Sequence, residues 1–208
     1  MTAPSPTPRA LDPALSRALL PLLLLAGCAI QRGVELPPLP DWETRQAVLS
    51  RMQDWEFKGR VGVSAGEEGF NANLRWKQEG DNFHAALSGP LGIGTVRIEG
   101  DGETVTVTDN DGNVHHLEDA DAELRAMYGW TLPVASLRYW ALGIPDPASP
   151  AATELAPGGR LAALEQRDWT VRFTDYEEDA GGVPLPRRLT ALNHDTRVRL
   201  VIDDWTFH

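Results

Sequence analysis

The segment FNANLRWK at residues 70–77 is the best guide to the fold, because its apolar and polar side chains alternate without a break. Successive side chains of a β-strand point to opposite faces of a sheet, so this pattern predicts a strand with one dry and one wet face. A second alternating run at residues 83–88 follows the turn-forming residues 80–82. The two runs together predict an antiparallel hairpin.

The period of two recurs on both sides of this hairpin. We expect further strands at residues 57–64, 95–99, 104–108, 113–116, 160–166, 169–176, 187–193 and 197–203. Short turns such as Asp101-Gly102 and Asp111-Gly112 separate several of them. Strands in such a serial antiparallel order curl into a barrel or fold into a sandwich.

Three segments have helical rather than strand character. Residues 41–54 open with Asp41 as a candidate N-cap, and residues 121–128 and 134–142 flank Pro133. The fold class is therefore mainly β with a few helices (α+β), and a curved sheet that wraps its helices is the natural arrangement. We expect residues 41–208 to form this single domain.

The N-terminal segment resembles the signal of a bacterial lipoprotein precursor. The apolar run at residues 18–25 is too short for a bilayer span, which needs ~20 residues, and it leads directly into Ala26-Gly27-Cys28. A buried N-terminal helix with a chance cysteine is the alternative, but Pro21 would break such a helix. The resemblance implies that residues 1–27 are a signal peptide that is removed, and that Cys28 carries the lipid.

Residues 28–40 follow as the lipidated cysteine and a flexible tether. Pro37, Pro38 and Pro40 and the lack of apolar periodicity favour an extended chain. Ala29 stands directly after the cysteine, and the lipoprotein resemblance implies sorting to the outer membrane of a Gram-negative bacterium.

Composition excludes several classes of function. The net charge of −11 opposes nucleic-acid binding, and an anionic membrane surface would not attract the domain by charge either. One cysteine allows neither a disulfide within the chain nor a cysteine metal cluster.

No motif indicates catalysis. Residues 62–66 match G-x-S-x-G, but an alternating strand follows where the esterase motif needs a helix. His115 and His116 are adjacent on a predicted strand and point to opposite faces. We therefore expect no enzymatic activity, no cofactor and no metal site.

One loop departs from the usual polar composition. Pro90, Leu91, Gly92 and Ile93 connect two predicted strands, and two of the four are large and apolar. Leu91 either folds back onto the core or forms an exposed tip that enters a membrane or partner. One buried leucine contributes ~1.5–3 kcal/mol, which favours transient insertion but does not anchor a protein.

Four stretches together resemble the outer-membrane lipoprotein receptor family LolB. Besides the segment ending at Cys28, they are LRWKQ at 74–78 leading into LSGPLG at 87–92, SLRYWALGIP at 136–145, and IDDW at 202–205. The resemblance implies a half-open, strongly curved antiparallel β-barrel whose helices line a hydrophobic cavity.

The resemblance also implies a role. Members of the family accept acylated lipoproteins from the periplasmic carrier LolA and insert them into the inner leaflet of the outer membrane. We expect a monomer, held by its lipid at the periplasmic face. The loop at Pro90–Ile93, and Leu91 above all, would serve membrane insertion rather than acceptance of cargo.

The apolar faces of the predicted elements supply candidate residues for the acyl-chain cavity. For each residue alone, ordinary core packing is the simpler interpretation, and a structural or assembly lipoprotein with a closed core is the alternative function. The candidates are Phe57, Val61, Phe70, Leu74, Trp76, Phe83, Leu87, Val96, Ile98, Met127, Leu137, Trp140, Trp169, Val171 and Phe173.

Overall fold

The computed structural model describes residues 41–89, 94–101, 104–177 and 183–208. These residues belong to one compact unit, which spans Gly33–His208. Cys28 and the segment 90–93 lie outside the described residues, as do residues 1–27 and 28–40, which we expected to be a signal peptide and a tether.

The described residues build a single antiparallel sheet whose strand order is β6-β5-β4-β3-β2-β1-β11-β10-β9-β8-β7. The sheet does not close, since β6 and β7 form its two edges. The strands are β1 (Asp54–Ala65), β2 (Glu68–Glu79), β3 (Asn82–Ser88), β4 (Thr95–Gly100), β5 (Val105–Thr108), β6 (Val114–Leu117), β7 (Ala152–Ala156), β8 (Arg160–Gln166), β9 (Trp169–Glu177), β10 (Leu185–Asn193) and β11 (Thr196–Phe207).

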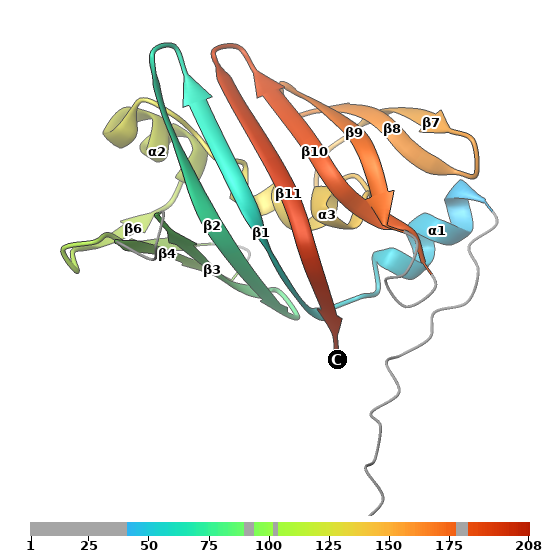
Figure 1. The fold of residues 1–208 in the computed structure, drawn as a ribbon, viewed down its shortest axis with the longest axis horizontal. Helices are drawn as coiled ribbons and strands as arrows, with labels where there is room; N and C mark the ends of the chain where they lie inside the picture. Colours follow the sequence, from blue (N-terminus) through green and yellow to red (C-terminus); the bar gives the residue numbers. More distant parts are fainter. Residues whose placement is uncertain (1–40, 90–93, 102–103, 178–182) are drawn as a thin grey trace, which may run out of the picture. The chain divides into compact units, whose positions relative to one another are not determined.

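Three helices accompany the sheet: α1 (Trp42–Leu49), α2 (Ala120–Tyr128) and α3 (Val134–Leu142). Helix α3 lies behind β10 and β11 on the inner side of the curve, whereas α2 lies behind β2 (Figure 1). The open sheet, curved around its helices, confirms the expected half-open barrel and excludes the sandwich.

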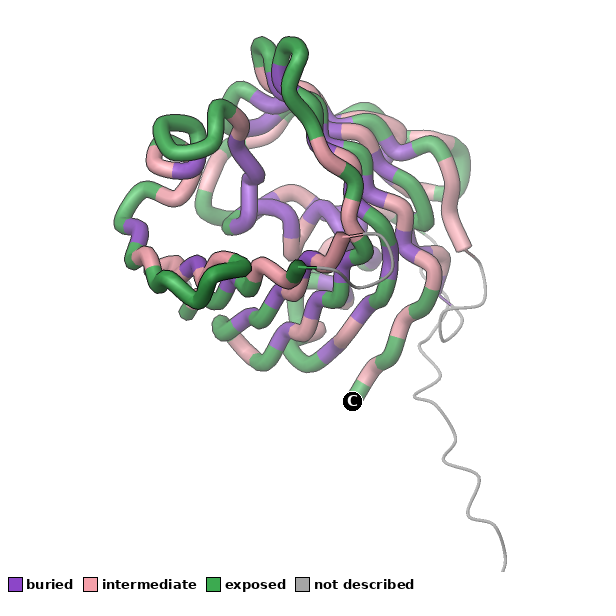
Figure 2. Tube along the Cα trace, turned by 60° about the vertical axis from the view of Figure 1, so that its left-hand side comes forward, coloured by how far each residue is buried: buried purple, intermediate pink, exposed green. Residues whose placement is uncertain are grey.

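The alternation of side chains places the core on the inner face of the sheet. Along β1 every second residue from Trp55 to Ala65 is buried, and β2 follows the same rule from Leu74 to Gln78. Figure 2 shows the alternation of buried and exposed positions along the strands. The 70–77 and 83–88 hairpin is confirmed, with Leu74 paired to Leu87 and Trp76 to Ala85.

Two elements differ from the sequence-based expectation. Helix α1 ends at Leu49 rather than at residue 54, because the turn after it leads straight into β1 at Asp54. Strand β7 was not predicted. Four of its five residues are exposed, so an edge strand of this kind shows no apolar alternation.

The G-x-S-x-G segment lies in a hairpin, as expected. Ser64 belongs to β1, and Gly66 begins the turn to β2 with a φ of +59°, which glycine adopts without strain. Among the described residues no helix is both long and apolar enough to cross a membrane.

Candidate functional site: an apolar cavity beneath β2–β5

The interior under β8–β11 is filled by α3. Leu137 and Trp140 of this helix are completely buried, and the Trp140 ring meets the Trp169 ring edge-on at 6.2 Å between centroids. The indole Nε1 of Trp140 donates to Gln166 Oε1 at 3.0 Å, so its polar atom is satisfied. The amide of Gln166 in turn donates to the backbone carbonyls of Asp146 and Ser149. The described residues around α3 therefore form a packed core.

A row of aromatic rings fills the middle of the interior, under β1–β3. Phe57 stacks on Trp55 and on Trp76, with centroids 6.0 and 6.2 Å apart, and Trp76 stacks on Phe83 at 4.7 Å. Trp76 Nε1 donates to Gln78 Oε1 at 3.1 Å. These four rings belong to the packed core, and none of them lines the space that remains.

That space is an apolar cavity of about 470 Å³ beneath β2–β5. Its wall combines inner-face residues of the strands with Leu124 and Tyr128 of α2 and with Trp130, which follows α2. The cavity is lined by Phe70, Asn71, Ala72, Leu87, Gly89, Gly94, Val96, Ile98, Val107, Asp109, Asn110, Leu124, Tyr128 and Trp130.

The α2 side of the cavity is held by aromatic contacts. Trp130 lies 4.9 Å from Phe70 and 5.6 Å from Tyr128 between ring centroids. Leu124 is the one buried residue of α2, and Tyr128 is 38% exposed. Helix α2 thus covers the cavity through a few side chains, whereas α3 is embedded in the core.

The cavity extends to the place where β2 and β3 part, and we infer that its mouth lies there. Pairing between these strands begins at Asn73 and Ser88, so residues 68–72 of β2 pair with β1 alone within the described chain. Gly89 and Gly94, which flank the segment 90–93, both line the cavity. Asn71, Asp109 and Asn110 contribute polar side chains to the lining.

Two carboxylates near the cavity differ in their surroundings. Hydrogen bonds from Asn113 hold the pKa of Asp109 below its usual value. Burial raises the pKa of Asp121, in the first turn of α2, to about 6, and the nearby charge of Asp119 adds to the effect. Asp121 is therefore largely ionised at neutral pH at an energetic cost to the α2 region.

The structure separates the sequence-based cavity candidates into three groups. Phe70, Leu87, Val96 and Ile98 line the cavity together. Met127 lies on α2 but is 41% exposed and is not part of the lining. The other candidates lie in the packed core and are Phe57, Val61, Leu74, Trp76, Phe83, Leu137, Trp140, Trp169, Val171 and Phe173.

Several lining residues were missed by sequence reasoning. Val107 lies on the buried face of β5, and its place in the alternating pattern could have predicted this. Leu124 and Tyr128 are spaced by four residues on α2, which places them on one helix face. Trp130 follows the helix in an irregular segment, and no local pattern indicates that it turns back to Phe70.

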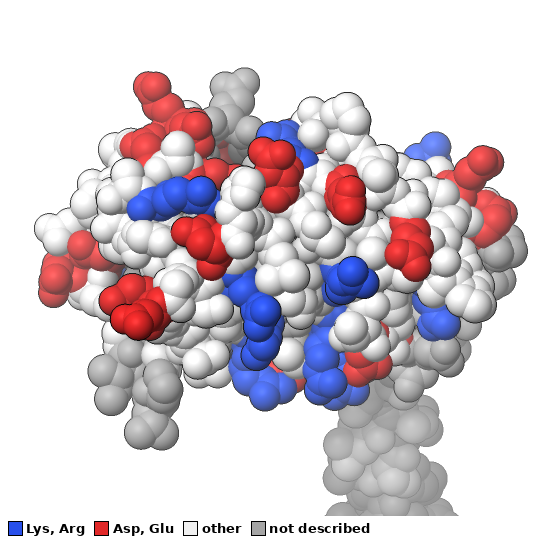
Figure 3. Space-filling view, turned by 90° about the horizontal axis from the view of Figure 1, so that it is seen from above, with Lys and Arg blue, Asp and Glu red and all other residues white. Residues whose placement is uncertain are grey.

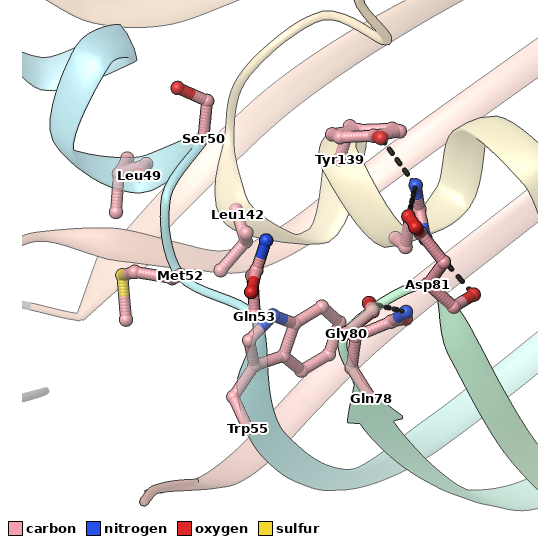
Figure 4. Close-up of a pocket in the computed structure, with 11 residues that line it drawn as sticks. Leu49, Ser50, Met52, Gln53, Trp55, Gln78, Gly80, Asp81, Tyr139 and Leu142 are labelled. Atoms are coloured by element: carbon pink, nitrogen blue, oxygen red, sulfur yellow. Dashed lines mark hydrogen bonds and ion pairs between the residues drawn. The ribbon is translucent and has the colours of Figure 1, made fainter.

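A second, smaller hollow of about 70 Å³ lies between α1, α3 and the β2–β3 turn. Figure 4 shows the polar groups that crowd it. Gln78 donates to the carbonyl of Gly80, and Arg138 pairs with Asp81 at 3.2 Å and donates to the hydroxyl of Tyr139. Its size and these contacts indicate a joint between elements rather than a binding site.

The described residues contain no group of three or more His, Cys, Asp or Glu arranged to hold a metal ion.

Comparison with known proteins connects this geometry to a family. Residues 53–205 match the family model described as outer membrane lipoprotein LolB. The chain is 36% identical over 192 residues to the outer-membrane lipoprotein LolB of Cellvibrio japonicus, covering 90% of this chain and 94% of the relative. With the protein of the same name from Nitrosococcus oceani the identity is 37% over 194 residues, covering 92% and 96%.

Solved structures support the fold. A LolA superfamily protein from Nitrosomonas europaea superposes with a TM-score of 0.53 at 9% identity, covering 81% of this chain and 94% of that one. A putative outer membrane lipoprotein-sorting protein domain from Vibrio parahaemolyticus gives a TM-score of 0.51 at 11% identity, covering 80% and 90%.

Proposed function

Because the chain belongs to the family of the outer-membrane lipoprotein LolB, we propose that it accepts acylated lipoproteins from a periplasmic carrier and inserts them into the inner leaflet of the outer membrane. The acyl chains of the cargo occupy the cavity beneath β2–β5 during the transfer. The carrier is a protein of the LolA type.

The apolar cavity is the observation that carries this proposal. Each CH₂ group moved from water into an apolar environment contributes ~0.8 kcal/mol, so a cavity of this lining selects an alkyl chain over a polar ligand. The polar side chains of Asn71, Asp109 and Asn110 suit the polar head of an acylated lipoprotein. The packed α3 half of the interior gives the wall its rigidity.

The transfer requires only a gradient of affinity. Acyl chains leave the carrier for this cavity if the cavity binds them more tightly, and leave the cavity for the bilayer because the bilayer covers them completely. No nucleotide is needed for either step.

The N-terminal part of the chain completes the proposal. Residues 1–27 are removed as a signal peptide, Cys28 carries the lipid anchor, and residues 28–40 are the tether to the domain at 41–208. At a maximum of ~3.6 Å per residue the tether reaches ~45 Å, so the domain can meet both the carrier and the membrane.

We assign membrane insertion to the loop Pro90–Ile93, with Leu91 as its apolar tip. The loop lies outside the described residues, but both glycines that flank it line the cavity. A loop anchored there is suitably placed to act on cargo that leaves the cavity.

Transfer of a purified acylated lipoprotein from the carrier to this protein, and from it to vesicles, tests the proposal. Val96→Trp fills the cavity and should lower acceptance at least tenfold. Ala86→Trp, which adds the same side chain on the outer face of β3, is the matched control. Leu91→Glu should accept cargo normally and release it poorly into vesicles.

Equal acceptance by the Val96→Trp and Ala86→Trp variants would contradict the cavity assignment. Normal acceptance and normal release by Leu91→Glu would leave the loop without its proposed role. Failure of the unaltered protein to accept any cargo would favour the alternative, a structural lipoprotein of the envelope.

A further inference from the structure

The outer face of the sheet collects basic side chains although the chain as a whole is acidic. Figure 3, viewed from the end where the β1–β2 and β10–β11 turns lie, shows several Lys and Arg side chains gathered along the lower middle of the view, with a few Asp and Glu among them and other basic side chains elsewhere. The residues that point away from the core here, and that we call the basic face, are Arg60, Arg172, Arg188, Arg197 and Arg199.

The charges of the basic face are mostly available to a ligand. Arg60 is bound to Asp203 through Nη2 at 2.9 Å and Nε at 3.2 Å. In the part of the chain that the structure describes, Arg172, Arg188, Arg197 and Arg199 have no ion pair within 4.0 Å. All are exposed.

A hollow of about 380 Å³ lies within the basic face. Its floor is Gly62, which is paired with Arg199 on β11 and with Asn71 on β2. Because Gly62 has no side chain, the guanidinium groups of Arg60 and Arg199 and the amides of Asn71 and Asn73 border an open space. A neighbouring hollow shares Gly62, Asn71 and Arg199, adds Arg197, and ends at the acidic turn residues Glu67 and Glu68.

The chemistry of this hollow suits a phosphate group. A guanidinium presents N–H donors in a planar fork that matches the oxygens of a phosphate, and side-chain amides add neutral donors. Arg197 and Arg199 have no carboxylate within 4.0 Å in the described chain, so their positive charges favour an anionic ligand.

The hollow and the apolar cavity lie back to back. Asn71 and Ala72 of β2 line both of them. In this stretch β2 pairs with β1 alone, so a phosphate bound on the outer face lies beside the mouth through which an acyl chain would pass.

We propose that the outer hollow around Gly62 binds the phosphate groups of anionic phospholipids and thereby holds the cavity mouth against the membrane that receives the cargo. The occupant is a membrane surface because members of this family are outer-membrane lipoproteins. The inference rests on the proposed function for its purpose, but headgroup binding is measured without cargo or carrier.

Vesicle binding of residues 33–208, the compact unit that contains every described helix and strand, tests this inference without the lipid anchor. The probes are phosphatidylcholine vesicles with and without phosphatidylglycerol. We expect binding only with phosphatidylglycerol at an ionic strength of about 0.05 M, and its loss at about 0.5 M, where screening is strong.

Three variants locate the site. The double variant Arg197→Gln/Arg199→Gln should weaken vesicle binding about thirtyfold, in line with the loss of two charges near an anionic surface. Arg51→Gln/Arg125→Gln removes two exposed charges from other elements and should change binding less than twofold. Gly62→Thr keeps every charge but fills the hollow, and should weaken binding about fivefold.

Equal losses in the two double variants, or unchanged binding by Gly62→Thr, would overturn the site in favour of diffuse attraction. Displacement of the vesicles by soluble polyglutamate at equal charge would reassign the basic face to an acidic protein. Failure of cargo transfer with intact vesicle binding would count against the proposed function alone.

Discussion

At the level of single residues, two glycines of β1 show how closely the strands of this sheet approach one another. A Cβ atom built on Gly59 would lie 2.1 Å from the carbonyl oxygen of Val201, which belongs to the backbone and cannot move aside. A Cβ atom on Gly62 meets the flexible side chain of Asn71, whose Oδ1 atom would lie 2.8 Å away. Gly59 lies where the register of β1 and β11 shifts, so its small size allows the strands to stay paired there.

This contrast predicts that the same substitution costs much more stability at Gly59 than at Gly62. Gly59→Ala should destabilise the domain by about 3 kcal/mol, since overpacking against backbone forces the strands apart. Gly62→Ala should cost less than about 1 kcal/mol. Thermal unfolding followed by circular dichroism checks both, and equal melting temperatures for the two variants would contradict the close approach at Gly59.

A second residue-scale prediction concerns Asp121. Its folded-state pKa of about 6 is above the ordinary 3.8, so the folded protein binds the proton more tightly than the unfolded chain. The group therefore stabilises the fold at low pH relative to neutral pH, and this contribution is lost as pH rises through about 6.

Asp121→Asn removes the ionised form and should raise stability at pH 7.5 by about 1 kcal/mol, reduced from the full linkage value because the side chain is only partly buried. At pH 4 the variant and the parent should unfold at the same temperature. Glu154→Gln on the exposed edge strand is the control. The assignment would be refuted if the difference in stability between the variant and the parent were the same at pH 4 and at pH 7.5.

At the level of elements, α2 and α3 have similar lengths but opposite roles. Helix α3 buries Val134, Ser136, Leu137, Trp140, Ala141 and Leu142, whereas α2 buries only Leu124. Few buried contacts mean a low cost of local opening. Helix α2 is thus the element of the cavity wall that can move to admit a ligand.

Hydrogen exchange measures this difference directly. Backbone amides of residues 124–128 should exchange at least about tenfold faster than those of residues 137–142, because local opening of α2 exposes little apolar surface. Binding of an acylated lipopeptide should slow exchange in α2 and leave α3 unchanged. Equal protection of the two helices in the free protein would contradict the mobile role of α2.

The elements also show where sequence reasoning succeeds. Alternation in β1–β3 and in β9–β11 marks one buried face, so strand type and the antiparallel order could be predicted. Alternation reports only that a side chain faces inward. It cannot distinguish Leu74, which meets the packed core, from Ala72, two residues away on the same face, which borders empty space.

The position of the hollow half is a property of tertiary packing. It depends on α3 filling one side and on Trp130 turning back to Phe70 on the other.

The charge of the outer face cannot be predicted from the composition either. A net charge of −11 argued against attraction to an anionic surface, but the sheet brings Arg60, Arg197 and Arg199 together from distant parts of the chain.

At the level of the whole molecule, an open sheet with one packed half and one hollow half explains how a stable domain can have room for an apolar ligand. The α3 half supplies a core that does not depend on a ligand, and Gln166 provides hydrogen-bond partners for the indole of Trp140 and for the backbone carbonyls of Asp146 and Ser149 inside it. The β2–β5 half keeps about 470 Å³ free beside residues 68–72 of β2, which pair with β1 but not with β3 within the described chain. Stability and binding are thus assigned to different parts of one sheet.

Photo-crosslinking with a triacylated lipopeptide that carries a diazirine on one acyl chain tests the central claim, that this cavity holds the acyl chains. The lipopeptide is bound to the purified protein, irradiated, and the labelled residues are mapped by mass spectrometry. We expect saturable labelling of residues 70–72 in β2, of Val96 in β4 and of residues 124–130, and no labelling of α3. Labelling that falls on α3 or on the outer face of the sheet, or that does not saturate, would contradict it.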